Sequence, residues 1–149
     1  MEKPTDRVEF ETMLLGRHTL NPRYRVDSSR LERSAYVLLC RLSIEGPMSI
    51  GQLSEAFSLD ASTLNRQTAA LVRSGLVERI PDPDGGMARK FRVTDQGEQS
   101  LTAERNANIE GLDRVMQNWS AEDVDTFARY LQRLNTDIER IGGRAWPRP

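Results

Sequence analysis

A run of small polar and cationic side chains between positions 61 and 74 has the chemistry needed to read DNA bases. Its members are Ser62, Thr63, Asn65, Arg66, Gln67 and Arg73. Arginine can pair with guanine, asparagine and glutamine with adenine, and serine and threonine with bases or phosphates. No Asp or Glu occurs from position 61 through position 76. An ordinary solvated helix face, which commonly mixes Glu with Lys and Arg, is the alternative, and we favour DNA readout.

A second basic group follows a glycine-rich turn. In the segment DPDGGMARK, Gly85-Gly86 supplies the unusual backbone angles of a tight turn, and Arg89 and Lys90 come just after it. Because successive side chains of a strand alternate between its faces, we expect only one of these two cations to reach DNA. The segment is not a phosphate loop, since no Lys-Ser or Lys-Thr pair follows the glycines. A plain surface turn is the alternative interpretation.

Enzymatic and metal chemistry find little support. The chain has one cysteine, Cys40, and one histidine, His18, so neither a disulfide framework nor a thiolate zinc site is expected, and no cofactor is predicted. Cys40 lies in an apolar helical pattern, which favours a buried structural thiol over a redox sensor, although Arg41 is its neighbour. Tyr36 is our candidate for lining a ligand pocket, although aromatic residues at helical spacing more commonly belong to the core.

Helix signals around the polar run predict a helix-turn-helix. Ser49 and Gln52 have capping-box spacing, so one helix starts at Ser49. Asp60 has the character of the N-cap of a second helix, and Gly75 suits its C′ position. The short gap between the two helices is that of a helix-turn-helix over 49–74.

The glycine-rich turn is expected to be the tip of a wing. Residues 76–80 and 90–93 alternate as strands do, which predicts a hairpin wing over about 76–94. A helix over 29–45 would complete a winged helix-turn-helix core spanning 30–94.

Long amphipathic helices flank this core. Residues 5–18 read as a helix that Asn21-Pro22 breaks, and helices over 95–118 and 120–141 follow the wing. The last helix carries a 3-4-3-4-3 seam formed by Val124, Phe127, Leu131, Leu134, Ile138 and Ile141. We interpret 5–18 and 95–141 as dimerisation helices; the alternative is an intrachain two-helix hairpin packed on the core. The tail 142–149 is expected to be loose or packed on the partner.

Bulk properties fit this scheme. The 149 residues suit a single domain, mainly α-helical with a small β-hairpin. No apolar run approaches the roughly 18 residues of a membrane span, and the charged N-terminus is no signal peptide, so we expect a cytoplasmic protein without membrane contact. The net charge of −1 is unevenly distributed. Residues 61–93 hold six basic and three acidic side chains, whereas residues 95–141 hold five basic and ten acidic ones.

Four short motifs together resemble the MarR family of transcriptional regulators across nearly the whole chain. They are L-S-E in the third helix, L-V-R-S-G-L-V-E-R after the polar helix, D-P-x-D before the wing tip and V-T-x-x-G after it. The resemblance implies a dimeric repressor or activator that dimerises through its first and last two helices. It also implies relief of DNA binding by small, often aromatic or phenolic, ligands. Family wings carry an arginine close behind the second Asp, where Gly86 or Met87 stands here. Either Arg89 takes its role or the wing contributes less to DNA binding, and we favour Arg89.

These observations predict a homodimeric regulator, a ligand-responsive repressor, that binds double-stranded DNA at a near-palindromic operator. Its half-sites should lie about one helical turn, roughly 34 Å, apart. Two alternatives stay open. One is a thiol-based redox regulator acting through Cys40, and the other is a winged-helix adaptor that contacts proteins and not DNA.

Overall fold

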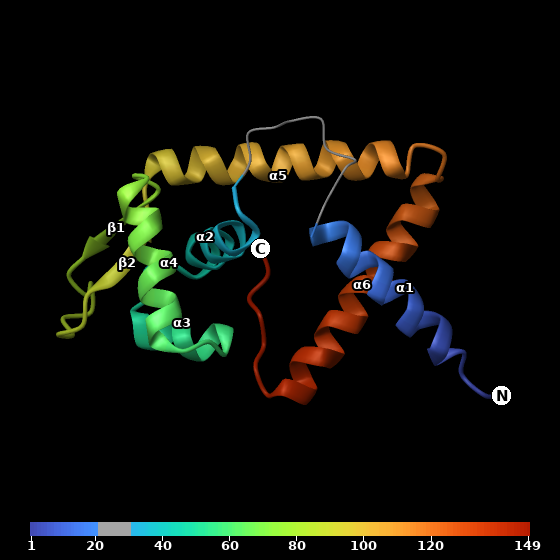
Figure 1. Ribbon diagram of the computed structural model, residues 1–149, viewed down its shortest axis with the longest axis horizontal. Coiled ribbons are helices and arrows are strands. Elements are labelled where there is room, and N and C mark those ends of the chain that lie inside the picture. Colours follow the sequence, from blue (N-terminus) through green and yellow to red (C-terminus); the bar gives the residue numbers. More distant parts are fainter. Residues whose placement is uncertain (21–30) are drawn as a thin grey trace.

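The chain forms a winged core at one end and a helical arm at the other (Figure 1). The arm consists of helices 5–20 and 121–142 and the distal part of helix 95–115. The computed structural model describes residues 1–20 and 31–149. Within these residues the element order is the predicted one, six helices with a hairpin between the fourth and the fifth. The elements are α1 (Thr5–Leu20), α2 (Arg33–Glu45), α3 (Ile50–Phe57), α4 (Ala61–Arg73), β1 (Val77–Ile80), β2 (Lys90–Val93), α5 (Asp95–Val115) and α6 (Ala121–Gly142).

Some predicted boundaries shift. Helix α2 begins at Arg33, and the expected break at Asn21-Pro22 and the expected start at 29–30 lie outside the described residues. Helix α5 ends at Val115, three residues before the predicted end, because the chain turns at 116–118 before Ser120 caps α6. No helix in the described ranges is both long and apolar enough to cross a membrane.

The predicted caps hold the helix-turn-helix. At the start of α3, the Ser49 hydroxyl accepts from the Gln52 amide at 3.2 Å while the Gln52 side chain accepts from the Ser49 amide at 2.9 Å, which is the expected capping box. At the end of α4, Gly75 adopts φ +76°. The Gly75 amide then donates to the Val72 carbonyl and the Leu76 amide to the Leu71 carbonyl, each at 3.0 Å, so the helix stops and β1 can begin.

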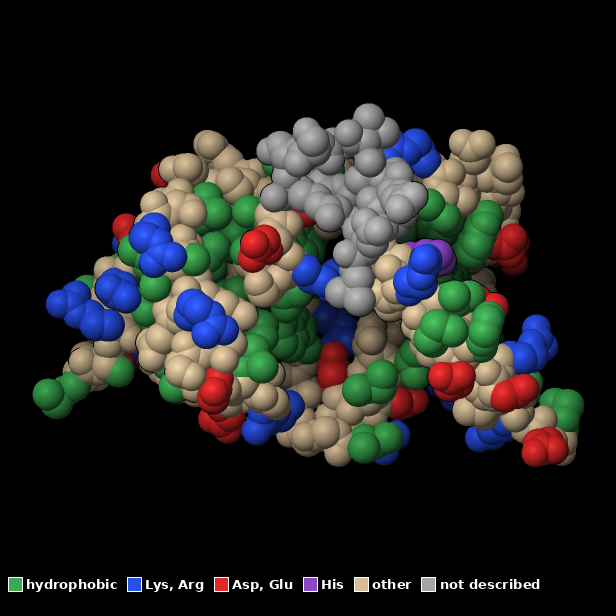
Figure 2. Space-filling model, viewed as in Figure 1, with side chains coloured by type: hydrophobic (Ala, Val, Ile, Leu, Met, Phe, Trp, Pro, Cys, Tyr) green, Lys and Arg blue, Asp and Glu red, His purple; other side chains and the backbone are tan. Residues whose placement is uncertain are grey.

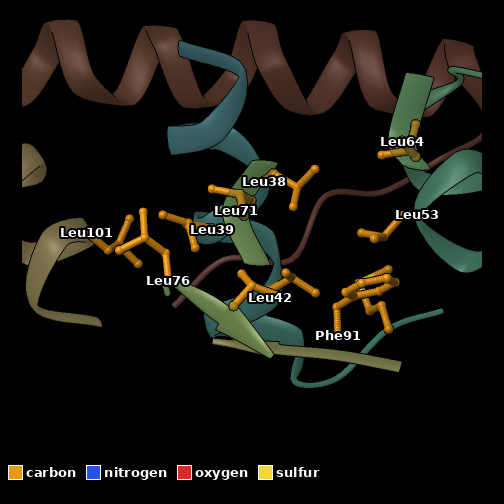
Figure 3. Packing of buried hydrophobic residues seen from close by; sticks show 11 residues of the cluster. Leu38, Leu39, Leu42, Leu53, Leu64, Leu71, Leu76, Phe91 and Leu101 are labelled. Carbon is orange, nitrogen blue, oxygen red and sulfur yellow. The ribbon is translucent and has the colours of Figure 1, made fainter. Parts of the chain in front are cut away.

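One hydrophobic cluster joins every element of the winged core (Figure 3). Its buried members are Leu38, Leu39, Leu42, Met48, Leu53, Leu64, Leu71, Leu76, Val77, Phe91 and Leu101. Leu64 and Leu71 come from α4, and the leucines of α2 pack against them. Burying this face of α4 leaves the opposite, polar face to solvent.

The wing is fixed to the start of α3 by a contact that the sequence did not indicate. In the hairpin, Val77 pairs with Val93 and Ile80 with Lys90. Met48, just before α3, adds a bridge to β2: the Phe91 amide donates to the Met48 carbonyl at 2.8 Å, and the Met48 amide donates back at 3.2 Å. Backbone hydrogen bonds therefore join the base of the wing to the helix-turn-helix.

The helical arm exposes apolar side chains instead of packing them within the chain. Helix α6 has no buried residue, and Ile138 and Ile141 on its predicted seam are 59% and 81% exposed. Among the described residues, α6 packs extensively on neither α5 nor the winged core, so the intrachain hairpin is not formed. Further large apolar side chains lie exposed on α1 and on the distal part of α5.

The expectation for the C-terminal tail was wrong. The tail packs on the winged core of its own chain, where Arg144 hydrogen-bonds Ser58 and Trp146 lies against Phe57. The sequence did not show this, because the contact joins residues about 90 positions apart.

We expect Gly97→Ala to destabilise the protein by about 1–3 kcal/mol. A Cβ at Gly97 would lie 2.1 Å from the Leu76 carbonyl oxygen, so the first turn of α5 would have to move away from the core. Thermal and urea unfolding measure the effect. Gly51→Ala is the control, because its Cβ would meet nothing nearer than Ser49 Oγ at 3.9 Å. Equal stability of the two variants would contradict the close approach.

Candidate nucleic-acid interface

The polar face of α4 lies open to solvent at one end of the molecule. The exposed predicted residues are Ser62, Asn65, Arg66 and Arg73, and the half-buried ones are Thr63 and Gln67. Lys and Arg side chains gather over this winged end, on the side where α4 and the hairpin lie (Figure 2). The structure therefore brings the predicted readers together on one surface.

Four of these side chains keep their hydrogen-bonding capacity for a ligand. Within the described part of the chain, Asn65, Arg66, Gln67 and Arg73 make no side-chain hydrogen bond or ion pair. Because breaking an internal bond would cost free energy on binding, free donors and acceptors at a helix surface favour readout of an external partner.

The N-terminus of α4 is held by Asp60. Its carboxylate accepts from the Thr63 amide at 3.2 Å and from the Ser62 hydroxyl at 3.1 Å. Hydrogen bonding to its carboxylate, by the Thr63 side chain first, then the Ser62 side chain and then the Thr63 amide, lowers the pKa of Asp60. Ser62 would thus have to exchange an internal partner before its hydroxyl could donate to a base or a phosphate.

The wing separates the two predicted cations as alternation requires. Lys90 Nζ lies 3.5 Å from Asp82 Oδ1, and both side chains are largely buried. The Asp84 amide also donates to Asp82 at 2.9 Å, and this bond, with a smaller contribution from Lys90, lowers the pKa of Asp82. Arg89 is exposed and makes no side-chain hydrogen bond or ion pair with the described residues. Lys90 therefore braces the wing tip, and Arg89 is the cation left free.

Arg79, which was not among the predicted DNA contacts, also lies on this surface. Its guanidinium lies 5.6 Å from the centre of the Phe91 ring, directly across the hairpin. With Asn65 of α4 and Arg89 it lines an open groove of about 830 Å³ between the start of α3 and the wing. The available signal was its place among the six basic residues of 61–93, but the register that pairs it with Phe91 depends on the tip length. Arg92 is tied to Glu78 at 2.5 Å instead.

Tyr36 and Cys40 belong to a separate polar group between α2 and α5. Burial, and then the neighbouring Cys40, raise the pKa of Tyr36, while side-chain hydrogen bonds with Asn108 and Arg105 oppose this rise. Cys40, predicted as a buried structural thiol, is half-buried: it packs against the core and also lies beside Arg105. The helix pattern missed this because Arg105 comes from a different element. In the described ranges no cluster of His, Cys, Asp and Glu is arranged to hold a metal ion.

Comparisons with known proteins agree with this geometry. Residues 31–85 match the profile of the MarR family. The HTH-type transcriptional regulator YxaD of Bacillus subtilis is 35% identical over 135 residues, which cover 90% of this chain and 94% of that protein. The chain belongs to the MarR family. It is a DNA-binding transcriptional regulator and not an enzyme.

Two solved structures share the fold. A MarR family protein from Bacillus stearothermophilus superposes with a TM-score of 0.74 at 23% identity, covering 93% of this chain and 99% of that one. The PcaV transcriptional regulator from Streptomyces coelicolor, in complex with its natural ligand, gives a TM-score of 0.63 at 21% identity, covering 90% and 94%. The predicted winged-helix fold is confirmed.

We expect Asp60→Ala to lower the melting temperature at about pH 7. Asp60→Asn should lower it much less, since asparagine also caps helices well. A carboxylate whose folded pKa is lowered contributes stability that is present above its ordinary pKa and is lost as the pH falls through the folded value. The difference between wild type and Asp60→Ala should therefore shrink toward about pH 3. Circular dichroism melts test this, and an unchanged difference would show that the carboxylate charge does not contribute.

Proposed function

We propose that the protein acts as a homodimer that binds a near-palindromic DNA operator, with α4 of each protomer in a major groove. The observation that carries the proposal is the acid-free polar face of α4, whose Asn65, Arg66, Gln67 and Arg73 have no internal partners among the described residues. Arg66 and Asn65 are the proposed base readers, and Arg73, Ser62 and Thr63 are proposed phosphate contacts. The two half-sites would lie roughly 34 Å apart.

The wing would contact DNA through Arg89. Its position beyond the tip and the groove that it shares with Asn65 and Arg79 support a contact next to the one made by α4. Lys90 was predicted as a second contact, and its pairing with Asp82 gives it a supporting role, in which it holds the tip for Arg89. Arg79 would add charge at the hairpin base.

Dimerisation is supported by the exposed apolar side chains of the helical arm. Phe127, Leu134, Ile138 and Ile141 line one side of α6, and α1 and α5 present further exposed apolar residues nearby in the fold. A monomer that left this much apolar surface in water would be prone to association. A second copy of the chain supplies a matching seam, since the same helices pack on themselves about a two-fold axis.

Repression and ligand response are further parts of the proposal. A dimer on an operator would block access to the DNA that it covers, and chromosomal DNA places its action in the cytoplasm. PcaV was solved with its natural ligand, which supports a small-molecule effector for this chain also. Tyr36, with Asn108 and Arg105 near it, is the proposed polar contact for an aromatic or phenolic effector between α2 and α5.

A thiol switch is the competing mechanism of control, because Cys40 is half-buried and lies beside Arg105. The adaptor alternative requires acidic or apolar side chains on the exposed face of α4. That face instead carries amide, hydroxyl and guanidinium groups.

Arg66→Ala should weaken binding to the cognate operator by roughly 1–3 kcal/mol, because a bidentate contact to a base would be lost. The operator is obtained by selecting bound sequences from a random DNA pool, and affinity is measured by fluorescence anisotropy. Arg133→Ala is the matched control, since Arg133 is an exposed arginine on α6, far along the chain from the winged core. A small, equal loss on all sequences would make Arg66 a phosphate contact. Failure of the wild type to bind any duplex at low salt would refute DNA binding.

Ile138→Glu should convert the dimer to a monomer, because it places a charge on the proposed seam. Light scattering coupled to gel filtration gives the mass. Arg133→Glu serves as the control, since it changes the charge of the same helix away from the seam. If both variants kept the wild-type mass, the α6 seam would not be the dimer interface.

A further inference from the structure

The C-terminal tail leaves α6 and crosses to the winged core. Helix α6 ends at Gly142, and Gly143, with φ +74°, turns the chain. Arg144 then donates from Nη1 to the Glu55 carbonyl and to the Ser58 hydroxyl. Figure 1 shows the tail running from the end of α6 to a terminus beside α2.

Trp146 is the apolar anchor of this crossing. Its ring meets the Phe57 ring edge-on, with centroids 5.2 Å apart. On α2, the Arg41 guanidinium lies 4.6 Å from the Trp146 ring centre. Arg41 is only 8% exposed, and Glu45 fixes it through a 2.5 Å contact to Nε. A cation that is largely desolvated and held in place strengthens such a contact.

Beyond Trp146 the tail is tied back to α6. Arg148 donates to the two carboxylate oxygens of Glu139 at 2.8 and 3.0 Å, and this pairing lowers the pKa of Glu139. The tail is thus attached to α6 at both ends, through the chain at Gly143 and through Arg148. The segment between these attachments holds the winged core.

The contacts on the winged core lie at the entrance to α4. Phe57 ends α3, and Ser58 is the left-handed residue (φ 53°) of the turn before α4. Asp60, the N-cap of α4, follows two residues later. Any displacement of Ser58 therefore moves the start of the recognition helix.

We propose that residues 144–148 form a strap that fixes the helix-turn-helix relative to α6, with Arg144 and Trp146 as positioning residues. Without it, α5 would be the main link between the winged core and the helical arm, and one long helix can bend and rotate. The bracing within one chain is independent of DNA. The effect of the strap on operator spacing rests on the proposed function. In the proposed homodimer, α6 lies at the dimer interface and so sets the distance between the two copies of α4.

The consequence for affinity is one of preorganisation. A dimer binds both half-sites only in the fraction of molecules whose recognition helices have the right separation. If loss of the strap reduced that fraction to about one tenth, affinity for the full operator would fall on the order of tenfold. Binding of one protomer to one half-site needs no such separation, so it would not change.

The bracing is tested by pulsed electron paramagnetic resonance on spin labels at Ala70→Cys in α4 and Arg133→Cys in α6. The labelled protein also carries Cys40→Ser, so that the spin labels attach only to the two introduced cysteines. Dilution with unlabelled protein isolates the distance within one chain. Trp146→Ala and Arg144→Ala should broaden the distance distribution. Arg140→Ala, which loses only its contact with Asp137 on α6, and Trp146→Phe should leave it narrow. An unchanged distribution in both strap variants would overturn the proposal, whether or not the protein binds DNA.

The second arm uses the selected operator, a single half-site duplex and operators with altered spacers. Trp146→Ala and Arg144→Ala should lose about tenfold in affinity for the full operator, keep wild-type affinity for the half-site, and discriminate less between spacers. A parallel loss on the half-site would mean damage to the helix-turn-helix and would overturn the positioning role. If the wild type bound no DNA, the proposed function would fail, and the distance measurement alone would decide the bracing.

Discussion

Burial of the apolar face of α4 against α2 is the constraint on which the rest of the structure depends. Leu64 and Leu71 lie in the shared core. Thr68 is fully buried between them, and its hydroxyl donates a hydrogen bond to the Leu64 carbonyl at 2.7 Å. Because this face of α4 is buried in the core, rotation of α4 about its axis would expose leucines and bury arginines, at a cost of several kcal/mol. The polar face is therefore turned outward by the core and not by any contact of its own.

Helix α5 connects the winged core to the helical arm. Its first turn can approach the end of α4 closely because Gly97 has no side chain, and Thr94 caps it while donating to the Gly75 carbonyl at 2.6 Å. Farther along, buried Glu104 accepts from the Leu31 amide at the entrance to α2, and Glu98 accepts from Ser43. These polar contacts fix α2 on α5. Helix α5 therefore packs on the winged core at its start and forms part of the helical arm at its end.

Ion pairing decides which of the basic residues are available to a polyanion. Arg92 and Lys90 are neutralised within the wing by Glu78 and Asp82. Arg66, Arg73 and Arg89 have no such partners in the described part of the chain, and they lie on one end of the molecule. A chain with a net charge of −1 can thus present a positive surface, because local and not total charge governs the approach of a phosphate backbone.

The sequence by itself determined the features that depend on near neighbours. Capping at Ser49 and Asp60, the glycine stop at Gly75 and the period of α4 all follow from bonds within one or two turns, so element order and the polar face were predictable. Only the tertiary structure decided how distant residues meet. The placement of Arg79 over Phe91, of Arg105 beside Cys40 and of Trp146 on Phe57 depends on register, helix packing and the path of the tail. No short-range pattern encodes these, because the contacts form only after the core has brought the elements together.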